Sequence, residues 1–161
     1  MFSNSRRLPR LVSAIVVCQL AGIVGSVFTV SSIPTWYAGL EKPFFAPPNW
    51  LFAPVWLSLY TLMGVSLYLV WSRSVDDRSV RAALSVFGIQ LVLNALWSVL
   101  FFGLRSPLLG LIEIAALWIA IVATIVLFYR VSRAAGLLLV PYIAWVTIAA
   151  ALNGFIWSLN P

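Results

Sequence analysis

The chain has 161 residues, of which 63% are hydrophobic and only 9% are charged; its net charge is +6 and its mean hydropathy is +1.05. Soluble domains carry about 25% charged residues, so this composition excludes a soluble globule and predicts a protein solvated by lipid. The chain contains no histidine and a single cysteine, Cys18. Imidazole general bases, histidine ligands for haem or zinc, and an internal disulfide bond are therefore excluded, and we predict no metal site.

Five long apolar runs are each able to cross a bilayer as a helix. In chain order they cover residues 11–33, 51–71, 82–104, 107–129 and 136–159. At ~1.5 Å per residue, runs of this length span the hydrocarbon core with some tilt. A β-barrel would need alternating segments of about ten residues, and these runs are longer and do not alternate. The sequence predicts one all-α membrane domain over residues 1–161, a bundle of five transmembrane helices.

The connection between the first two predicted helices is long and rich in proline. It covers residues 34–49 and contains Pro34, Pro43, Pro47 and Pro48. Proline fixes backbone angles and interrupts helix, so this loop is expected to be semi-rigid. A long ordered loop beside the mouth of a bundle is a candidate lid.

Basic residues divide unequally between the two sides of the predicted bundle. Lys42 and Arg105 are on the side of the first loop, and eight residues are on the other: Arg6, Arg7, Arg10, Arg73, Arg78, Arg81, Arg130 and Arg133. The positive-inside rule then places the N-terminus in the cytoplasm, and the first loop and the C-terminus outside. In a membrane protein this charge indicates topology, and we expect no nucleic-acid partner.

Small residues in the first predicted helix recur at four-residue spacing. They are Ala14, Cys18, Gly22 and Ser26. Small side chains allow two helices to approach closely. The stripe is consistent either with packing inside one bundle or with the seam of a homodimer. For the dimer, Ala116 and Ala120 in the fourth predicted helix offer a second seam.

Aromatic and amide side chains share the inward faces of three predicted helices. Amides inside a lipid-embedded bundle are expected to face inward, where they form interhelical hydrogen bonds or contact a ligand. Together with indole rings they would form a flat, apolar pocket with few hydrogen-bonding groups, which suits a planar aromatic ligand. The residues concerned are Trp56, Tyr60, Gln90, Asn94, Trp97, Tyr142 and Trp145.

Glu113 is the single carboxylate within a predicted span. It lies six residues after Pro107, ~9 Å from the start of its helix, which is close enough to the interface for snorkelling. Its alternatives are an interhelical hydrogen bond, or contact with a ligand or proton.

Several ordered motifs carry a family resemblance. The first loop and the start of the second helix contain WYAGLEKP at 36–43, PPNW at 47–50 and PVW at 54–56. Later blocks at 90–103, 108–118 and 141–153 follow in the same order. Together, over about residues 14–158, they resemble the translocator protein family, also called TspO/MBR or tryptophan-rich sensory proteins.

The resemblance implies a five-helix bundle, usually a homodimer, whose pocket is capped by the first loop and binds porphyrins. It assigns Trp36 in the loop and Asn94 in the pocket to ligand binding. Some bacterial members break down protoporphyrin in light, and the tryptophans tied to that activity match Trp56 and Trp145. Phenylalanine stands at 44 and 45, where the family often has tryptophan. The cholesterol motif of animal members is incomplete here.

We therefore expect a bilayer protein that binds a tetrapyrrole, with a sensory, regulatory or protective role. Porphyrin would be its ligand or substrate, and no cofactor is expected. The alternatives are a transporter of porphyrin or lipid-like molecules, a photochemical enzyme that uses Trp56 and Trp145, and a structural membrane protein. The expected ligand-binding residues are Trp36, Trp56, Tyr60, Gln90, Asn94, Trp97, Tyr142 and Trp145, and the expected lid residues are Pro43, Pro47 and Pro48.

Overall fold

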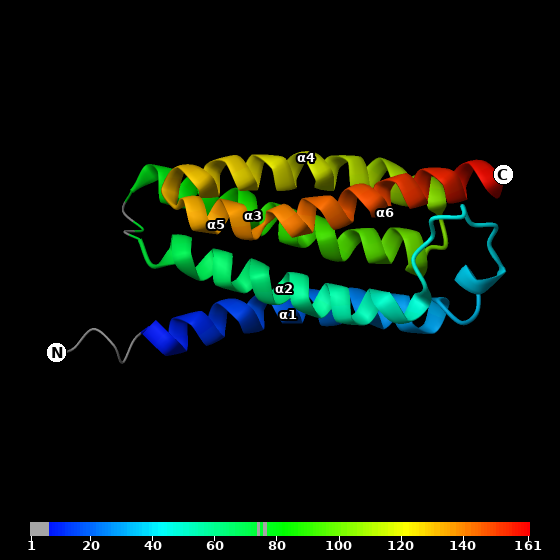
Figure 1. Ribbon diagram of the computed structural model, residues 1–161, viewed down its shortest axis with the longest axis horizontal. Coiled ribbons are helices and arrows are strands. Elements are labelled where there is room, and N and C mark those ends of the chain that lie inside the picture. Colours follow the sequence, from blue (N-terminus) through cyan, green and yellow to red (C-terminus); the bar gives the residue numbers. More distant parts are fainter. Residues whose placement is uncertain (1–6, 74, 76) are drawn as a thin grey trace.

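The computed structural model describes residues 7–73, 75 and 77–161, so Arg6 lies outside the described part. In that part every regular element is helical (Figure 1). The helices are α1 (Arg7–Ser32), η1 (Tyr37–Gly39), α2 (Asn49–Trp71), α3 (Arg78–Ser98), η2 (Val99–Gly103), α4 (Pro107–Val131), α5 (Arg133–Leu138) and α6 (Val140–Leu159). With η2 joined to α3 and α5 to α6, the described residues form five candidate spans. This confirms the predicted all-α bundle.

The five spans run up and down (Figure 1), as expected where the helices after α2 are joined by short connections. α1 packs on α2 and α3, and α4 packs between α3 and α6, while α5 packs against α2 and α4. The first loop and the C-terminus lie at the same end of the bundle, opposite the start of α1 (Figure 1). Large apolar side chains remain exposed along the spans, as expected where lipid is the solvent.

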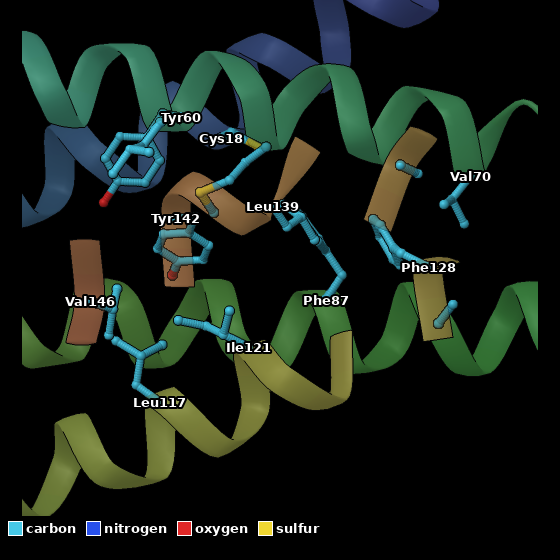
Figure 2. Packing of buried hydrophobic residues seen from close by; sticks show 14 of the residues in the cluster. Cys18, Tyr60, Val70, Phe87, Leu117, Ile121, Phe128, Leu139, Tyr142 and Val146 are labelled. Carbon is cyan, nitrogen blue, oxygen red and sulfur yellow. The ribbon is translucent and has the colours of Figure 1, made fainter. Parts of the chain in front are cut away.

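Buried apolar side chains from all of these spans form the core. Figure 2 shows Cys18, Phe87, Phe128 and Leu139 packed between the helices, with the phenol rings of Tyr60 and Tyr142 in the same layer. The rings of Phe87 and Phe128 stack with centroids 5.4 Å apart. The core thus continues directly into the polar residues described below.

The helix ends follow local capping chemistry. Asp77 accepts a hydrogen bond from the backbone N–H of Ser79 at 2.8 Å, which caps the start of α3 four residues before the predicted start. Ser106 caps α4, whose first residue is Pro107. The predicted helix at 136–159 is divided at Leu139 into α5 and α6. Pro141 has no N–H for the carbonyl of Leu137, which explains the interruption there.

The third span ends in a π-helical turn. The backbone N–H of Leu104 donates to the carbonyl of Val99 at 2.8 Å, an i to i+5 bond. This wider turn allows the consecutive residues Phe101 and Phe102 to be buried together, each with 2% of its surface exposed. Ser32 of α1 donates to the carbonyl of Phe102 at 3.0 Å and links this turn to the first helix.

Two glycines mark the close approach of α1 to α2. A Cβ atom at Gly22 would lie 2.5 Å from Cε2 of Tyr60, and one at Gly64 would lie 2.5 Å from Cα of Ile15. Within one chain, therefore, Gly22 serves helix packing inside the bundle.

The first loop is folded against the end of the bundle. Tyr37 is buried and its ring lies 6.3 Å from that of Phe52 and 5.8 Å from that of Phe102. Burial raises the pKa of Tyr37 to about 12. Lys42 Nζ lies 4.8 Å from the centroid of this ring and donates to the carbonyls of Tyr37 and Leu40, both at 2.8 Å.

Candidate ligand-binding site

A cavity of about 280 Å³ lies between α1, α2 and the end of the third span, in the half of the bundle nearest the first loop. This volume is near the lower limit for small-molecule pockets, which run from about 300 Å³ upward. Among the residues predicted for ligand binding, four line the cavity: Trp56, Tyr60, Asn94 and Trp97. The other lining residues include Gln19, Gly22, Gly25, Phe52, Ala53, Ser98 and Phe102.

A chain of hydrogen bonds begins at the cavity wall and continues into the core. The Tyr60 hydroxyl donates to Asn94 Oδ1. Asn94 Nδ2 donates to the Tyr142 hydroxyl at 2.8 Å, which donates in turn to Gln90 Oε1 at 2.9 Å. One hydrogen on Nδ2 and one lone pair on Oδ1 of Asn94 are not used in this chain. The amide is therefore held in place while one donor and one acceptor position remain for a ligand.

Indole rings form two walls of the cavity. Trp56 stacks on Tyr60 with ring centroids 5.5 Å apart and meets Tyr142 in a T-shaped contact with centroids 6.4 Å apart. Trp97 stacks on Phe101 at 5.1 Å and donates from Nε1 to Asn153 Oδ1 at 3.1 Å. Because their neighbours fix both rings, they present flat faces without rearrangement.

The other predicted ligand-binding residues lie outside the cavity lining. Tyr142 and Gln90 are buried behind Asn94 in the hydrogen-bonded chain. Trp145 contacts Phe52 with ring centroids 6.0 Å apart, and its indole N–H has no partner among the described residues. Trp36 packs on Phe101 from the loop, at 5.5 Å.

The predicted lid residues are also absent from the lining. Pro43, Pro47 and Pro48 lie in the loop, and the cavity wall reaches that region only at Ile33 and Asn49, where the loop begins and ends. The loop contacts the wall indirectly, through Tyr37 on Phe52 and Phe102. Closure of the cavity by these prolines stays a prediction.

Several residues at the site are not among those expected to bind a ligand. Gln19 lines the cavity and donates from Nε2 to the carbonyl of Leu57 and to Thr61 Oγ1, both at 3.0 Å. The sequence did carry a signal for Gln19, because an amide side chain within the apolar run 11–33 is expected to face inward. Asn153 fixes Trp97 and donates to the carbonyl of Pro107 at 2.7 Å. Phe102 falls within the family block at 90–103, but its place at the cavity depends on the π-helical turn.

Glu113 is buried on α4, with 7% of its surface exposed. Neither carboxyl oxygen has a hydrogen-bond partner among the described residues. The structure therefore shows neither the snorkelling geometry nor the interhelical hydrogen bond considered for it. No group of three His, Cys, Asp or Glu side chains able to hold a metal occurs in the described part of the chain.

Comparisons with known proteins identify the family. The model of the TspO/MBR family matches residues 14–158. The chain is 51% identical over 152 residues to "Tryptophan-rich protein TspO" of Archaeoglobus fulgidus, which covers 94% of this chain and 97% of that protein. It is 39% identical over 144 residues to human "Translocator protein", which covers 88% and 85%. It is 35% identical over 125 residues to "Tryptophan-rich sensory protein" of Cereibacter sphaeroides, which covers 78% and 77%. The resemblance of the sequence motifs is thus confirmed, and the chain belongs to the TspO/MBR family.

Proposed function

We propose that this membrane protein binds a flat, largely apolar ligand of the tetrapyrrole class in the cavity between α1, α2 and α3, in a sensory, regulatory or protective role. The observation that carries the proposal is the pair of fixed indole walls, Trp56 and Trp97, in one cavity with the hydrogen-bonded amide of Asn94. The names of the translocator and sensory relatives support a membrane sensory or transport role.

The surroundings of the cavity indicate how such a ligand would fit. Ile23, Val30 and Leu57 line the cavity and are themselves exposed on the spanning helices. The cavity is therefore open on the side that faces lipid. A planar ring system could stack on the indoles while its remaining edge extends toward the bilayer. A ligand larger than the cavity volume of about 280 Å³ could therefore still bind. Such a ligand would reach the site from the membrane.

Transport of porphyrin or a lipid-like molecule is the alternative function. Its support is the same lateral opening, since a carrier must exchange cargo with the bilayer. The cavity, however, is confined to the half of the bundle beside the first loop, which favours binding over passage. Liposomes that contain the purified protein test this directly, because only a transporter increases porphyrin flux across them.

Tryptophan fluorescence during titration with protoporphyrin tests the proposed site. Ala53 lines the cavity, so Ala53→Phe fills the space without removing a hydrogen bond. We expect the wild-type protein to be quenched saturably, and Ala53→Phe to bind at least tenfold more weakly. Ala151→Phe is the matched control, since Ala151 is exposed on α6 and is not part of the lining. Equal affinity of Ala53→Phe and the wild type would place the ligand elsewhere.

A further inference from the structure

Asn160, the residue that follows α6, joins the C-terminus to the first loop. The backbone N–H of Glu41 donates to Asn160 Oδ1 at 3.0 Å, and Asn160 Nδ2 donates to the carbonyl of Glu41 at 3.0 Å. These two residues are 119 positions apart in the sequence. We name this pair of hydrogen bonds the Asn160 bridge.

The chemistry of the bridge is that of a peptide group. An asparagine side chain carries one carbonyl and one NH₂, so it can pair with both backbone groups of a single residue, as a neighbouring strand does. The second Nδ2 hydrogen of Asn160 is also used, since Nδ2 donates to the carbonyl of Ile156 at 2.8 Å. Both donor hydrogens are thus engaged, which fixes the amide plane relative to the end of α6.

On its other side, the bridge contacts a compact part of the loop. Lys42 Nζ donates to the carbonyls of Tyr37 and Leu40, so residues 37–42 are tied together around one ammonium group. The buried ring of Tyr37 belongs to the same unit and packs on Phe52 and Phe102. Those two phenylalanines line the ligand cavity. A displacement at Glu41 would therefore be transmitted through Tyr37 to the cavity wall.

Apolar contacts also hold the loop to α6. Tyr37 is buried in one cluster with Leu152 and Ile156 of α6, and Leu40 and Phe45 pack against that cluster. Phe45 meets Phe155 with ring centroids 5.4 Å apart, and Phe155 is itself exposed on the last turns of that helix. All of these contacts are apolar, and apolar burial is non-directional, so they do not set the orientation of the backbone at Glu41. The bridge, by contrast, has defined direction and two hydrogen bonds.

We infer that Asn160 is a positioning residue: its side chain holds the first loop on the end of the bundle and, through Tyr37, sets the cavity wall at Phe52 and Phe102. The position of the loop follows from these contacts alone. Only the consequence for ligand exchange rests on the proposed function. The competing role for Asn160 is capping of α6 through the carbonyl of Ile156, without effect on the loop.

Hydrogen exchange of the full chain in nanodiscs, without ligand, separates these roles. Asn160→Ala removes the whole bridge, and we expect amide exchange at residues 37–48 to increase at least tenfold, most clearly at Glu41. Asn160→Asp keeps an acceptor for the Glu41 N–H and should protect that amide better than Asn160→Ala does. Ser158→Ala is the matched control, because the Ser158 hydroxyl donates only within its own helix, to Phe155. Faster exchange confined to residues 155–160 would overturn the inference in favour of simple capping.

Ligand kinetics give a second measurement. Dissociation of protoporphyrin, followed by recovery of tryptophan fluorescence, should be several-fold faster from Asn160→Ala than from the wild type or Ser158→Ala. If loop exchange increases while the wild-type protein does not bind protoporphyrin, the proposed function fails and the positioning role stands. If protoporphyrin binds but loop exchange is unchanged in Asn160→Ala, the positioning role fails.

Discussion

At the scale of single residues, Trp56 and Trp145 occupy different environments. These are the two tryptophans that match those tied to porphyrin breakdown in some bacterial family members. Trp56 lines the cavity and stacks on Tyr60, whereas Trp145 lies outside the lining, beside Phe52, and its indole N–H has no partner in the described part of the chain. Contact with a ligand and participation in photochemistry can therefore be tested separately.

Replacement by phenylalanine makes that distinction, because phenylalanine keeps a flat apolar ring that is much harder to oxidise than indole. Trp56→Phe should weaken protoporphyrin binding tenfold or less, since an aromatic contact contributes about 0.5–1.5 kcal/mol beyond burial. Trp145→Phe should leave affinity unchanged. Light-dependent loss of protoporphyrin absorbance should fall well below the wild-type rate in both variants, and remain normal in Trp157→Phe, an exposed control. Normal photobreakdown in both would mean that these tryptophans only pack.

The amides show how far single residues could be interpreted from sequence. The inward orientation of Asn94 and Gln90 follows from the cost of an unpaired amide in lipid, and both are buried. Their division of roles does not follow, because it depends on which partner lies opposite. Asn94 lines the cavity. Gln90 is the last residue in the series of hydrogen bonds, and its Nε2 has no partner among the described residues. The burial of the Glu113 carboxyl without a partner among residues 7–73, 75 and 77–161 was equally beyond prediction, since a helix position does not specify the facing side chains.

At the scale of elements, helix length was predictable and helix irregularity was not. Long apolar runs define spans because lipid requires backbone hydrogen bonds within each helix. The π-helical turn at Val99–Gly103 adds no sequence pattern of its own, and the burial of Phe101 beside Phe102 stabilises it only in the folded bundle. The break at Leu139 had a signal, Pro141, but proline is also tolerated within transmembrane helices, as Pro54 is in α2.

Close packing of α1 on α2 makes a prediction about the small-residue stripe. A Cβ at Gly22 would meet the Tyr60 ring, which Asn94 and Trp56 hold in place. Gly22→Ala should therefore destabilise the protein by about 1–3 kcal/mol through overpacking, without changing its oligomeric state. Gly88→Ala is the control, since nothing lies within 4 Å of the added carbon there, and alanine favours helix by up to about 1 kcal/mol.

Thermal unfolding in detergent and light scattering measure these two effects. If the wild type is a dimer and Gly22→Ala is a monomer of unchanged stability, Gly22 does not serve packing within one bundle. The dimer interface would then include α1. A homodimer seam through the exposed Ala116 and its neighbour Ala120 stays a prediction.

At the scale of the whole molecule, the up-and-down topology gathers charge at one end. The beginnings of α1, α3 and α5 and the ends of α2 and α4 meet there (Figure 1). Seven described arginines lie at that end: Arg7, Arg10, Arg73, Arg78, Arg81, Arg130 and Arg133. Lys42 and Arg105 belong to the opposite end, together with the first loop and the cavity.

This asymmetry predicts orientation, because basic residues beside short loops are retained on the cytoplasmic side. The first loop, the ligand cavity and the Asn160 bridge would then face away from the cytoplasm. A membrane-impermeant maleimide should label Asn49→Cys in sealed right-side-out vesicles, and label Ser79→Cys only after the vesicles are opened. Both positions are exposed, and the native Cys18 is fully buried and should contribute little background. Labelling of Ser79→Cys alone in sealed vesicles would reverse the orientation and place the loop and cavity on the cytoplasmic side.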